Sequence, residues 1–157
     1  MEVMKSNKVA SIAILLWVAT VAVFAWFFIR GNTVSGTDNR TAIVLGAGER
    51  DMVLSEMRKL LSGVQGILDG INRGDMKQVA SAAHAVGMSA AADANPALIA
   101  KLPMPFKQLG MGTHRDLDEI SKAAESGKPA PELLNMLSGV LAKCTSCHAA
   151  FQFKTGN

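Results

Sequence analysis

Tyrosine is absent from this sequence, and aromatic residues make up only 5% of it. Aromatic and β-branched runs, which favour β-strands, are correspondingly few. Alanine, leucine and methionine, which favour helices, are common instead, with 9 methionines among the 157 residues. The composition therefore predicts an all-α protein.

The sequence also lacks a cluster of charge of one sign. Its formal net charge is +3, but the excess comes from Lys5, Lys8 and Arg30, which flank a hydrophobic segment near the N-terminus. After Arg30 there are 13 basic and 12 acidic residues, so the rest of the chain is nearly neutral. Nucleic-acid binding requires a clustered basic face, and we therefore expect no nucleic-acid partner.

Long hydrophobic runs are limited to Val9–Ile29, which has no charge over about 21 residues and could cross a hydrocarbon core of roughly 30 Å as a helix. A cleaved signal peptide is the alternative. Its apolar part would be about 7–15 residues, whereas this run is longer and ends in bulky residues around Trp26 that suit a membrane interface. We expect an uncleaved anchor over 1–30. Lys5 and Lys8 predict that the N-terminus is cytoplasmic and the remainder lies outside the cytoplasm.

The rest of the chain divides into a predicted tether over 31–48, with at most a short apolar contact over 42–45, and a folded domain over 49–157. In this domain apolar residues recur at intervals of three and four, which is typical of helices with one buried face. The predicted helices cover about 49–72, 75–92, 113–126 and 132–153. Four such helices predict an antiparallel four-helix bundle, preceded by a single transmembrane helix.

Only two cysteines are present, and they stand in Cys144-Thr145-Ser146-Cys147-His148. Two thiols three residues apart, followed directly by a histidine, have the spacing that covalent attachment of a c-type haem requires. A zinc site would need a second ligand pair, a thioredoxin-like pair would need a βαβ context, and a disulfide across one helical turn would constrain almost nothing. We therefore expect one covalent haem c, with Cys144 and Cys147 as thioether anchors and His148 as the proximal iron ligand.

The orientation of this motif follows from helical geometry. At about 100° per residue, Leu137, Leu141, Cys144 and His148 fall within about 60° of one another on the last predicted helix. This spacing predicts that His148 projects into the same buried face as the leucines, with Cys147 about a quarter-turn away.

A four-helix domain with its single Cys-x-x-Cys-His near the C-terminal end resembles the class II c-type cytochromes, the cytochrome c′ group. The resemblance covers roughly 50–154, and includes Cys144–Phe151, which is similar to the family's Cys-x-x-Cys-His-x-x-aromatic ending, and the loop from Leu102 to Phe106. It implies a monohaem protein in which Cys144 and Cys147 form the thioether bonds and His148 is an axial ligand, and it implies a capacity to form homodimers. The N-terminal anchor departs from the usual soluble form of the family.

In this family the first helix of the bundle supplies the residue that faces the sixth coordination position of the iron. With Arg50 as register, the resemblance places Leu54 there, which would leave the position vacant. A slip of one turn places Met57 there, and a thioether ligand would stabilise ferrous iron. Met57 also lies on the predicted buried stripe and could be an ordinary core residue, so both alternatives stay open. We interpret His84 and His114 as plain polar histidines.

Together these features predict a membrane-anchored monohaem c-type cytochrome. It would carry single electrons at the periplasmic side of a bacterial cytoplasmic (inner) membrane, to or from a respiratory or photosynthetic complex. The alternatives are a five-coordinate haem protein that binds or senses nitric oxide or carbon monoxide, and a structural haem subunit of a membrane assembly. No set of general acid, base and nucleophile is evident, so we expect no enzymatic activity.

Overall fold

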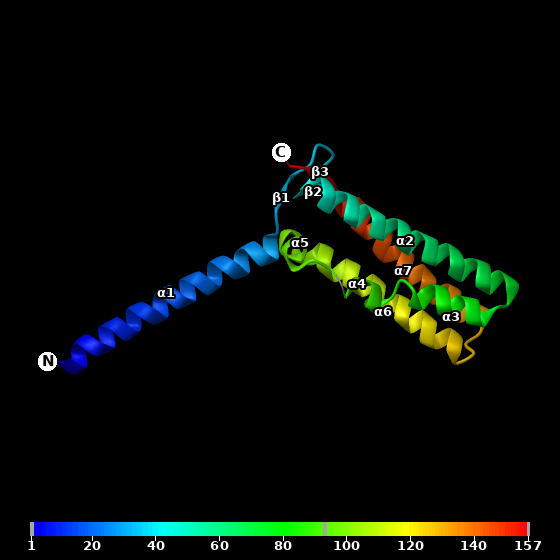
Figure 1. The fold of residues 1–157 in the computed structure, drawn as a ribbon, viewed down its shortest axis with the longest axis horizontal. Coiled ribbons are helices and arrows are strands. Elements are labelled where there is room, and N and C mark those ends of the chain that lie inside the picture. Colours follow the sequence, from blue (N-terminus) through cyan, green and yellow to red (C-terminus); the bar gives the residue numbers. More distant parts are fainter. Residues whose placement is uncertain (1, 93, 157) are drawn as a thin grey trace.

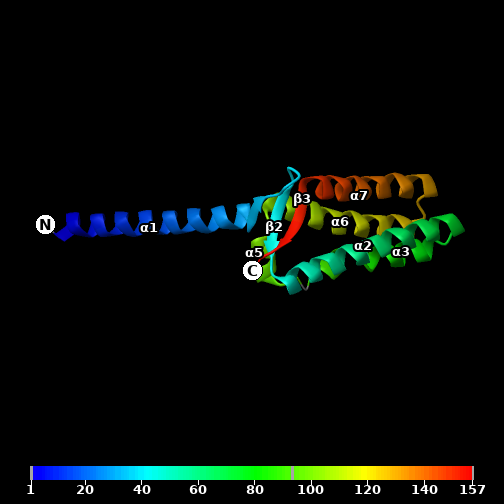
Figure 2. The same ribbon diagram turned by 90° about the horizontal axis from the view of Figure 1, so that it is seen from above.

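The computed structural model describes residues 2–92 and 94–156, which are mostly helical and include one small sheet (Figure 1, Figure 2). Along the chain the elements are α1 (Glu2–Arg30), β1 (Thr33–Ser35), β2 (Thr41–Leu45), α2 (Ala47–Arg73), α3 (Met76–His84), α4 (Met88–Ala91), α5 (Pro96–Lys101), α6 (Met104–Glu125), α7 (Ala130–Ala150) and β3 (Phe151–Thr155). Helices α2 to α7 form one helical body, and α1 projects from the end of this body that holds the sheet.

Helix α1 confirms the predicted hydrophobic helix. Its segment Asn7–Arg30 has a mean hydropathy of 2.6 and is long and apolar enough to cross a membrane. No part of this segment is buried inside the protein. A helix that is apolar on every side and has no protein covering it suits a lipid environment.

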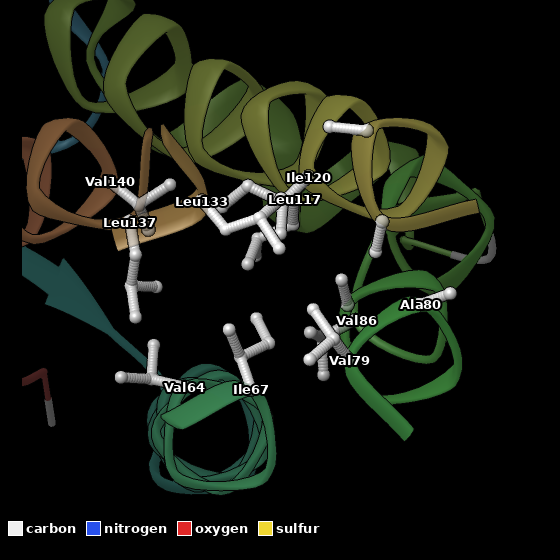
Figure 3. Close-up of a cluster of buried hydrophobic side chains, with 13 residues drawn as sticks. Val64, Ile67, Val79, Ala80, Val86, Leu117, Ile120, Leu133, Leu137 and Val140 are labelled. Atoms are coloured by element: carbon white, nitrogen blue, oxygen red, sulfur yellow. The ribbon is translucent and has the colours of Figure 1, made fainter. Parts of the chain in front are cut away.

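Helices α2, α3, α6 and α7 surround a core of aliphatic side chains, which we call the helical core (Figure 3). Leu117, Ile120 and Leu133 are completely buried in it, and each such side chain stabilises the fold by about 1.5–3 kcal/mol. The predicted buried stripe of the first helix is confirmed at Val64 and Ile67, but it is wrong at Leu61 and Leu68, which are exposed. The core consists of Val64, Ile67, Val79, Ala80, Ala83, Val86, Leu117, Ile120, Ala123, Ala124, Leu133, Leu137 and Val140.

The four helices are not packed equally around this core. Helix α3 packs closely against α2 and α6, and α6 against α7, whereas α2 and α7 touch at few points. Glycines permit the close contact on the α3 side: a Cβ atom on Gly63 would lie 2.5 Å from Cγ2 of Val86, and one on Gly70 would lie 2.8 Å from Cγ2 of Val79. We call the loosely packed side between α2 and α7 the seam.

The small sheet is the main departure from an all-α fold. Its strands have the order β1-β2-β3, with β1 antiparallel and β3 parallel to β2. The segment 31–48, which we predicted to be a tether, thus contains two strands and the first turn of α2. The structural reason is burial: Ala42, Ile43 and Leu45 are buried, and the β-branched content of this short segment suits a strand once β3 pairs with it.

Three helix boundaries differ from the prediction. The second predicted helix is interrupted after His84, and α4 begins only at Met88. Helix α6 begins at Met104 rather than near residue 113, because Pro103 and Pro105 occupy the N-cap and first turn, where proline is tolerated. The last helix ends at Ala150, since Phe151 adopts an extended backbone and begins β3.

A second cluster of buried apolar side chains lies beneath the sheet and is called the sheet cluster. Its buried members are Ile43, Leu45, Leu98, Leu102 and Phe106, and the half-buried side chains packed against them are Val53, Met57, Ile99, Cys147, Phe151 and Phe153. The ring of Phe106 meets those of Phe151 and Phe153 edge to face, with centroids 5.6 and 5.7 Å apart. Aromatic packing therefore joins β3 to α6.

Candidate functional site

The Cys-x-x-Cys-His motif occupies the last two turns of α7, at the end of the helical body that holds the sheet. Cys144 packs against the helical core and Cys147 against the sheet cluster, so the two thiols bridge the two apolar regions. Both thiols are free and half-buried. The helix ends immediately afterwards, where the amide of Phe151 donates to the carbonyl of Cys147.

Burial raises the pKa of both thiols, so that they resist ionisation further above neutral pH than an exposed thiol would. Desolvation raises the pKa of Cys144, and desolvation together with the neighbouring Cys144 raises the pKa of Cys147 to about 11. Metal coordination and thiol–disulfide exchange both use the thiolate. The environment of these cysteines therefore differs from that of a reactive redox pair, in which the pKa of the attacking thiol is lowered.

The orientation of His148 corrects our helical-wheel prediction. Leu137 is 1% exposed, as expected, but Leu141 is 41% exposed and His148 is exposed as well. The buried face of α7 is centred on Leu133, Leu137 and Val140, so Leu141 and His148 lie at one edge of this face. Leu137, Leu141, Cys144 and His148 share one sector of about 60° of the helix, as predicted from its pitch. The centre of this sector is rotated away from the direction of the core.

The side of α7 that carries His148 is opposite the side that faces α6. Lys143 marks the α6 side, since its Nζ pairs with a carboxylate oxygen of Asp116 and donates to the carbonyl of Gly112 at 3.4 Å. At about 100° per residue, Leu134, Leu141 and His148 lie about 140–180° from Lys143 around the helix. These three side chains therefore border the seam.

Helix α2 presents a matching apolar side to the seam. Its glycine face packs against α3, and Leu54, Met57, Leu61 and Leu68 lie on the opposite side at about 100° per residue. Leu61 is 68% exposed and Leu68 is 44% exposed, and Leu54 and Met57 are half-buried. Exposed leucines along one side of a core helix indicate a surface that suits an apolar partner.

The two sides of the seam are in register at the motif. Val64 of α2 and Leu137 of α7 point toward one another in Figure 3. Because the helices run in opposite directions with the same rise per residue, Met57 lies at about the level of Cys144, and Leu54 at about the level of Cys147 and His148. The structure thus brings both predicted candidates for the sixth position to the height of the motif, on the facing helix.

This arrangement fits a haem group by its chemistry. A porphyrin is flat and apolar over most of its area, and near the motif the seam offers the exposed side chains of Leu61 from α2 and Leu141 from α7. Leu68 and Leu134 continue this apolar surface about 15–20 Å from the motif along the two helices. Two thiols stand at one edge, with an imidazole on the next residue. The two cysteines and the histidine that would hold the group are therefore present at the end of an apolar surface.

Arg40, which we did not single out from the sequence, supports the end of the motif helix. Its guanidinium donates to the carbonyls of His148 at 3.3 Å and Phe151 at 3.4 Å. These carbonyls are at the C-terminal end of α7, where a positive charge is favourable. Asp38 holds the arginine by an ion pair at 2.6 Å. Hydrogen bonding to Arg40 lowers the pKa of Asp38, and the same bond raises the pKa of Arg40. No sequence signal could reveal this contact, since more than a hundred residues separate the partners.

The other two histidines have separate roles. His84 is exposed, lies 3.8 Å from a carboxylate oxygen of Asp118, and borders a shallow depression near Gly127, away from the motif. Nδ1 of His114 lies 2.8 Å from the carbonyl of Val86, so this ring joins α6 to the turn after α3. The interpretation of both as polar structural residues agrees with these contacts.

Within residues 2–92 and 94–156, no three His, Cys, Asp or Glu side chains lie close enough to hold a metal ion between them. Comparison with known proteins adds no relative, since no protein-family model, no curated protein and no solved structure matches the chain.

Proposed function

We propose that this protein is a membrane-anchored monohaem c-type cytochrome that carries single electrons at the periplasmic side of a bacterial cytoplasmic membrane. One observation supports the proposal above all others: the Cys-x-x-Cys-His motif stands at the end of an apolar seam whose leucines, two from α2 and two from α7, are 41–68% exposed. The fold would be the antiparallel four-helix bundle of the class II cytochromes, extended by the sheet. The redox partner would be a respiratory or photosynthetic complex.

In this proposal the seam holds the haem. Cys144 and Cys147 would form the two thioether bonds, and His148 would be the proximal ligand. The haem supplies a one-electron redox couple when it is bound. The leucines of α2 and α7 would exclude water from its faces, which reduces the reorganisation of solvent during electron transfer. Arg40 would keep His148 in place by fixing the end of α7.

The membrane part of the proposal depends on α1. This helix would remain as an uncleaved anchor, with Lys5 and Lys8 on the cytoplasmic side and the helical body outside. A tethered carrier meets a membrane partner at a high effective concentration. This benefit favours an electron carrier over a protein that binds a freely diffusing ligand.

A second candidate function is the binding of nitric oxide or carbon monoxide at a vacant sixth position. It is favoured by Leu54, which lies at about the level of His148, and by the packing of Met57 against the sheet cluster, where it already has apolar partners. A methionine that fills a gap in this cluster would not be free to reach the iron. The two functions therefore differ in which of these side chains faces the metal.

Optical spectra of the ferric and the reduced protein, with and without carbon monoxide, test the proposal. Sharp reduced bands that carbon monoxide does not shift would support a six-coordinate electron carrier, and Met57→Ala should then convert a low-spin ferric spectrum to a high-spin one. A high-spin spectrum that shifts with carbon monoxide in the parent protein, and does not change in Met57→Ala, would support the gas-binding function. A purified protein without haem bands would contradict both.

A further inference from the structure

We propose that the haem is held rigidly at the membrane surface, and that its electron partner is a redox protein embedded in the same membrane rather than a soluble carrier. This inference rests on the proposed function, because it concerns the position of the haem. It follows from how α1 is joined to the rest of the protein. A flexible tether would let the haem meet partners at any height above the membrane, whereas a rigid junction would restrict it to one height.

The chain is locked in place directly after α1. Gly31 has a φ of +66°, which favours glycine, and a Cβ atom at this position would lie 2.5 Å from the carbonyl oxygen of Lys101. The amide of Asn32 donates to the same carbonyl at 2.7 Å, and its side-chain amide donates to the carbonyl of Val44 at 2.9 Å. Asn32 is thus hydrogen-bonded to both α5 and β2, and Gly31 packs closely against the end of α5. No free linker separates α1 from the helical body.

Lys107 adds a second connection between α1 and the helical body. Lys107 lies in the first turn of α6. Its Nζ donates to the carbonyl of Phe28 at 2.8 Å and stands 3.4 Å from the centre of the Phe28 ring. Burial lowers the pKa of Lys107, in agreement with a side chain folded against α1. Phe28 belongs to the last turn of the membrane helix, so α6 begins at the level where that helix leaves the membrane.

The sheet places the motif at this same level. Ile43 in the middle strand pairs with Thr33 on one side and with Phe153 on the other. Adjacent strands are about 4.8 Å apart, so the chain leaving α1 and the chain leaving the motif are separated by only about 10 Å across the sheet. Figure 2 shows β3 and the end of α7 at the end of the helical body from which α1 projects, whereas the α6–α7 connection lies at the far end.

The two tryptophans allow a direct test, since Trp17 and Trp26 both belong to α1 and haem quenches nearby tryptophan emission. Along the axis of α1, Trp17 is about 13.5 Å farther from the helical body than Trp26 is. In the haem-loaded full-length protein in lipid nanodiscs, W17F leaves Trp26 as the only emitter and W26F leaves Trp17. We expect Trp26 to be quenched much more strongly than Trp17. Equal quenching in a protein with covalent haem would overturn the position proposed here and leave the cytochrome proposal intact.

An insertion tests whether the junction sets this distance. Six Gly/Ser residues between Arg30 and Gly31 add a mean span of about 13 Å, so the emission of Trp26 should rise to about that of Trp17 in the uninserted protein. The same six residues between Lys128 and Pro129, at the far end of the helical body, are the control and should leave the emission unchanged. Both variants should keep the parent haem spectrum. No rise on insertion at Gly31 would contradict a rigid junction.

The partner class is tested with the same variants in membranes of the native host. If the partner is embedded in the membrane, the insertion at Gly31 should slow reoxidation of the haem after reduction by ascorbate, while the control insertion should not. Reoxidation that is equally fast in all three proteins would contradict a membrane-embedded partner. If no haem is attached to the parent protein, the cytochrome proposal fails first and this inference fails with it.

Discussion

The helical core and the sheet cluster are assembled from different kinds of contact. The helical core joins α2, α3, α6 and α7, and most of its residues recur every three or four positions within each helix. The sheet cluster joins β2, the region of α5, the start of α6 and β3, and residues of α2 and α7 pack against it. Its members therefore come from both ends of the domain and from the middle of the chain. The motif lies where the two meet, because Cys144 contacts the first region and Cys147 the second. We infer that one region holds the fold and the other sets the position of the motif.

The largest expected effect comes from a substitution in the helical core. Leu117 is completely buried, and Leu117→Ala should lower the free energy of unfolding by about 2–5 kcal/mol. Because this core joins four helices, helix content and any haem spectrum should be lost together on heating. Met111→Ala, on the same helix but 38% exposed, is the matched control and should change stability by less than about 0.5 kcal/mol. Similar losses in both variants would contradict the assignment of the core.

A substitution in the sheet cluster should separate the two regions. Ile43 is completely buried, and Ile43→Ala should cost about 2–3 kcal/mol, toward the lower part of the range for such substitutions. The loss should release β3 and the end of α7 before the helical core melts. Thermal scans should therefore show the haem absorption changing at a lower temperature than the helical circular dichroism. A single shared transition would indicate that the two regions unfold as one unit.

The buried thiols predict a pH effect in protein prepared without haem. The unfolded chain loses the thiol protons near pH 9, but burial raises the pKa of Cys147 to about 11. The folded protein thus holds more protons over this interval, and its stability should fall as the pH rises from about 9 to about 11. Cys147→Ala should reduce this dependence of the free energy of unfolding on pH. Haem-loaded protein should lack it, since thioether sulfurs do not ionise, and the same fall in loaded protein would contradict covalent attachment.

The smallest expected effect comes from Arg40. Its bonds to the carbonyls of His148 and Phe151 are long and partly open to solvent, so Arg40→Met should change overall stability only slightly. It should nevertheless shift the reduction potential of the haem, because it removes a positive charge beside the axial ligand. Arg73→Met, which removes an exposed arginine paired with Asp69, is the control and should leave the potential unchanged. If the two variants have the same reduction potential, Arg40 does not support the motif in the way proposed here.

The sequence predicts the helical core better than the sheet cluster, and the reason is physical. The apolar spacing that places Val64 and Ile67 inside the core depends only on the pitch of one helix. The strand at Thr41–Leu45 pairs with β1 on one side and, on the other, with β3 more than a hundred residues later, and a short apolar segment alone does not reveal such a distant partner. The motif itself is evident from Cys144, Cys147 and His148. The exposure of His148 was missed, because a helical wheel gives relative angles and not the direction of the core.

The most direct test of the cytochrome proposal is the intact mass of the purified full-length protein after acid–acetone extraction. We expect the mass of the chain plus one haem, because two thioether bonds through Cys144 and Cys147 resist this treatment. Cys147→Ser should retain at most a single thioether bond, and Cys144→Ser with Cys147→Ser should give the mass of the chain alone. A parent protein that loses all of its haem on extraction, or a double variant that retains it, would contradict covalent attachment at this motif.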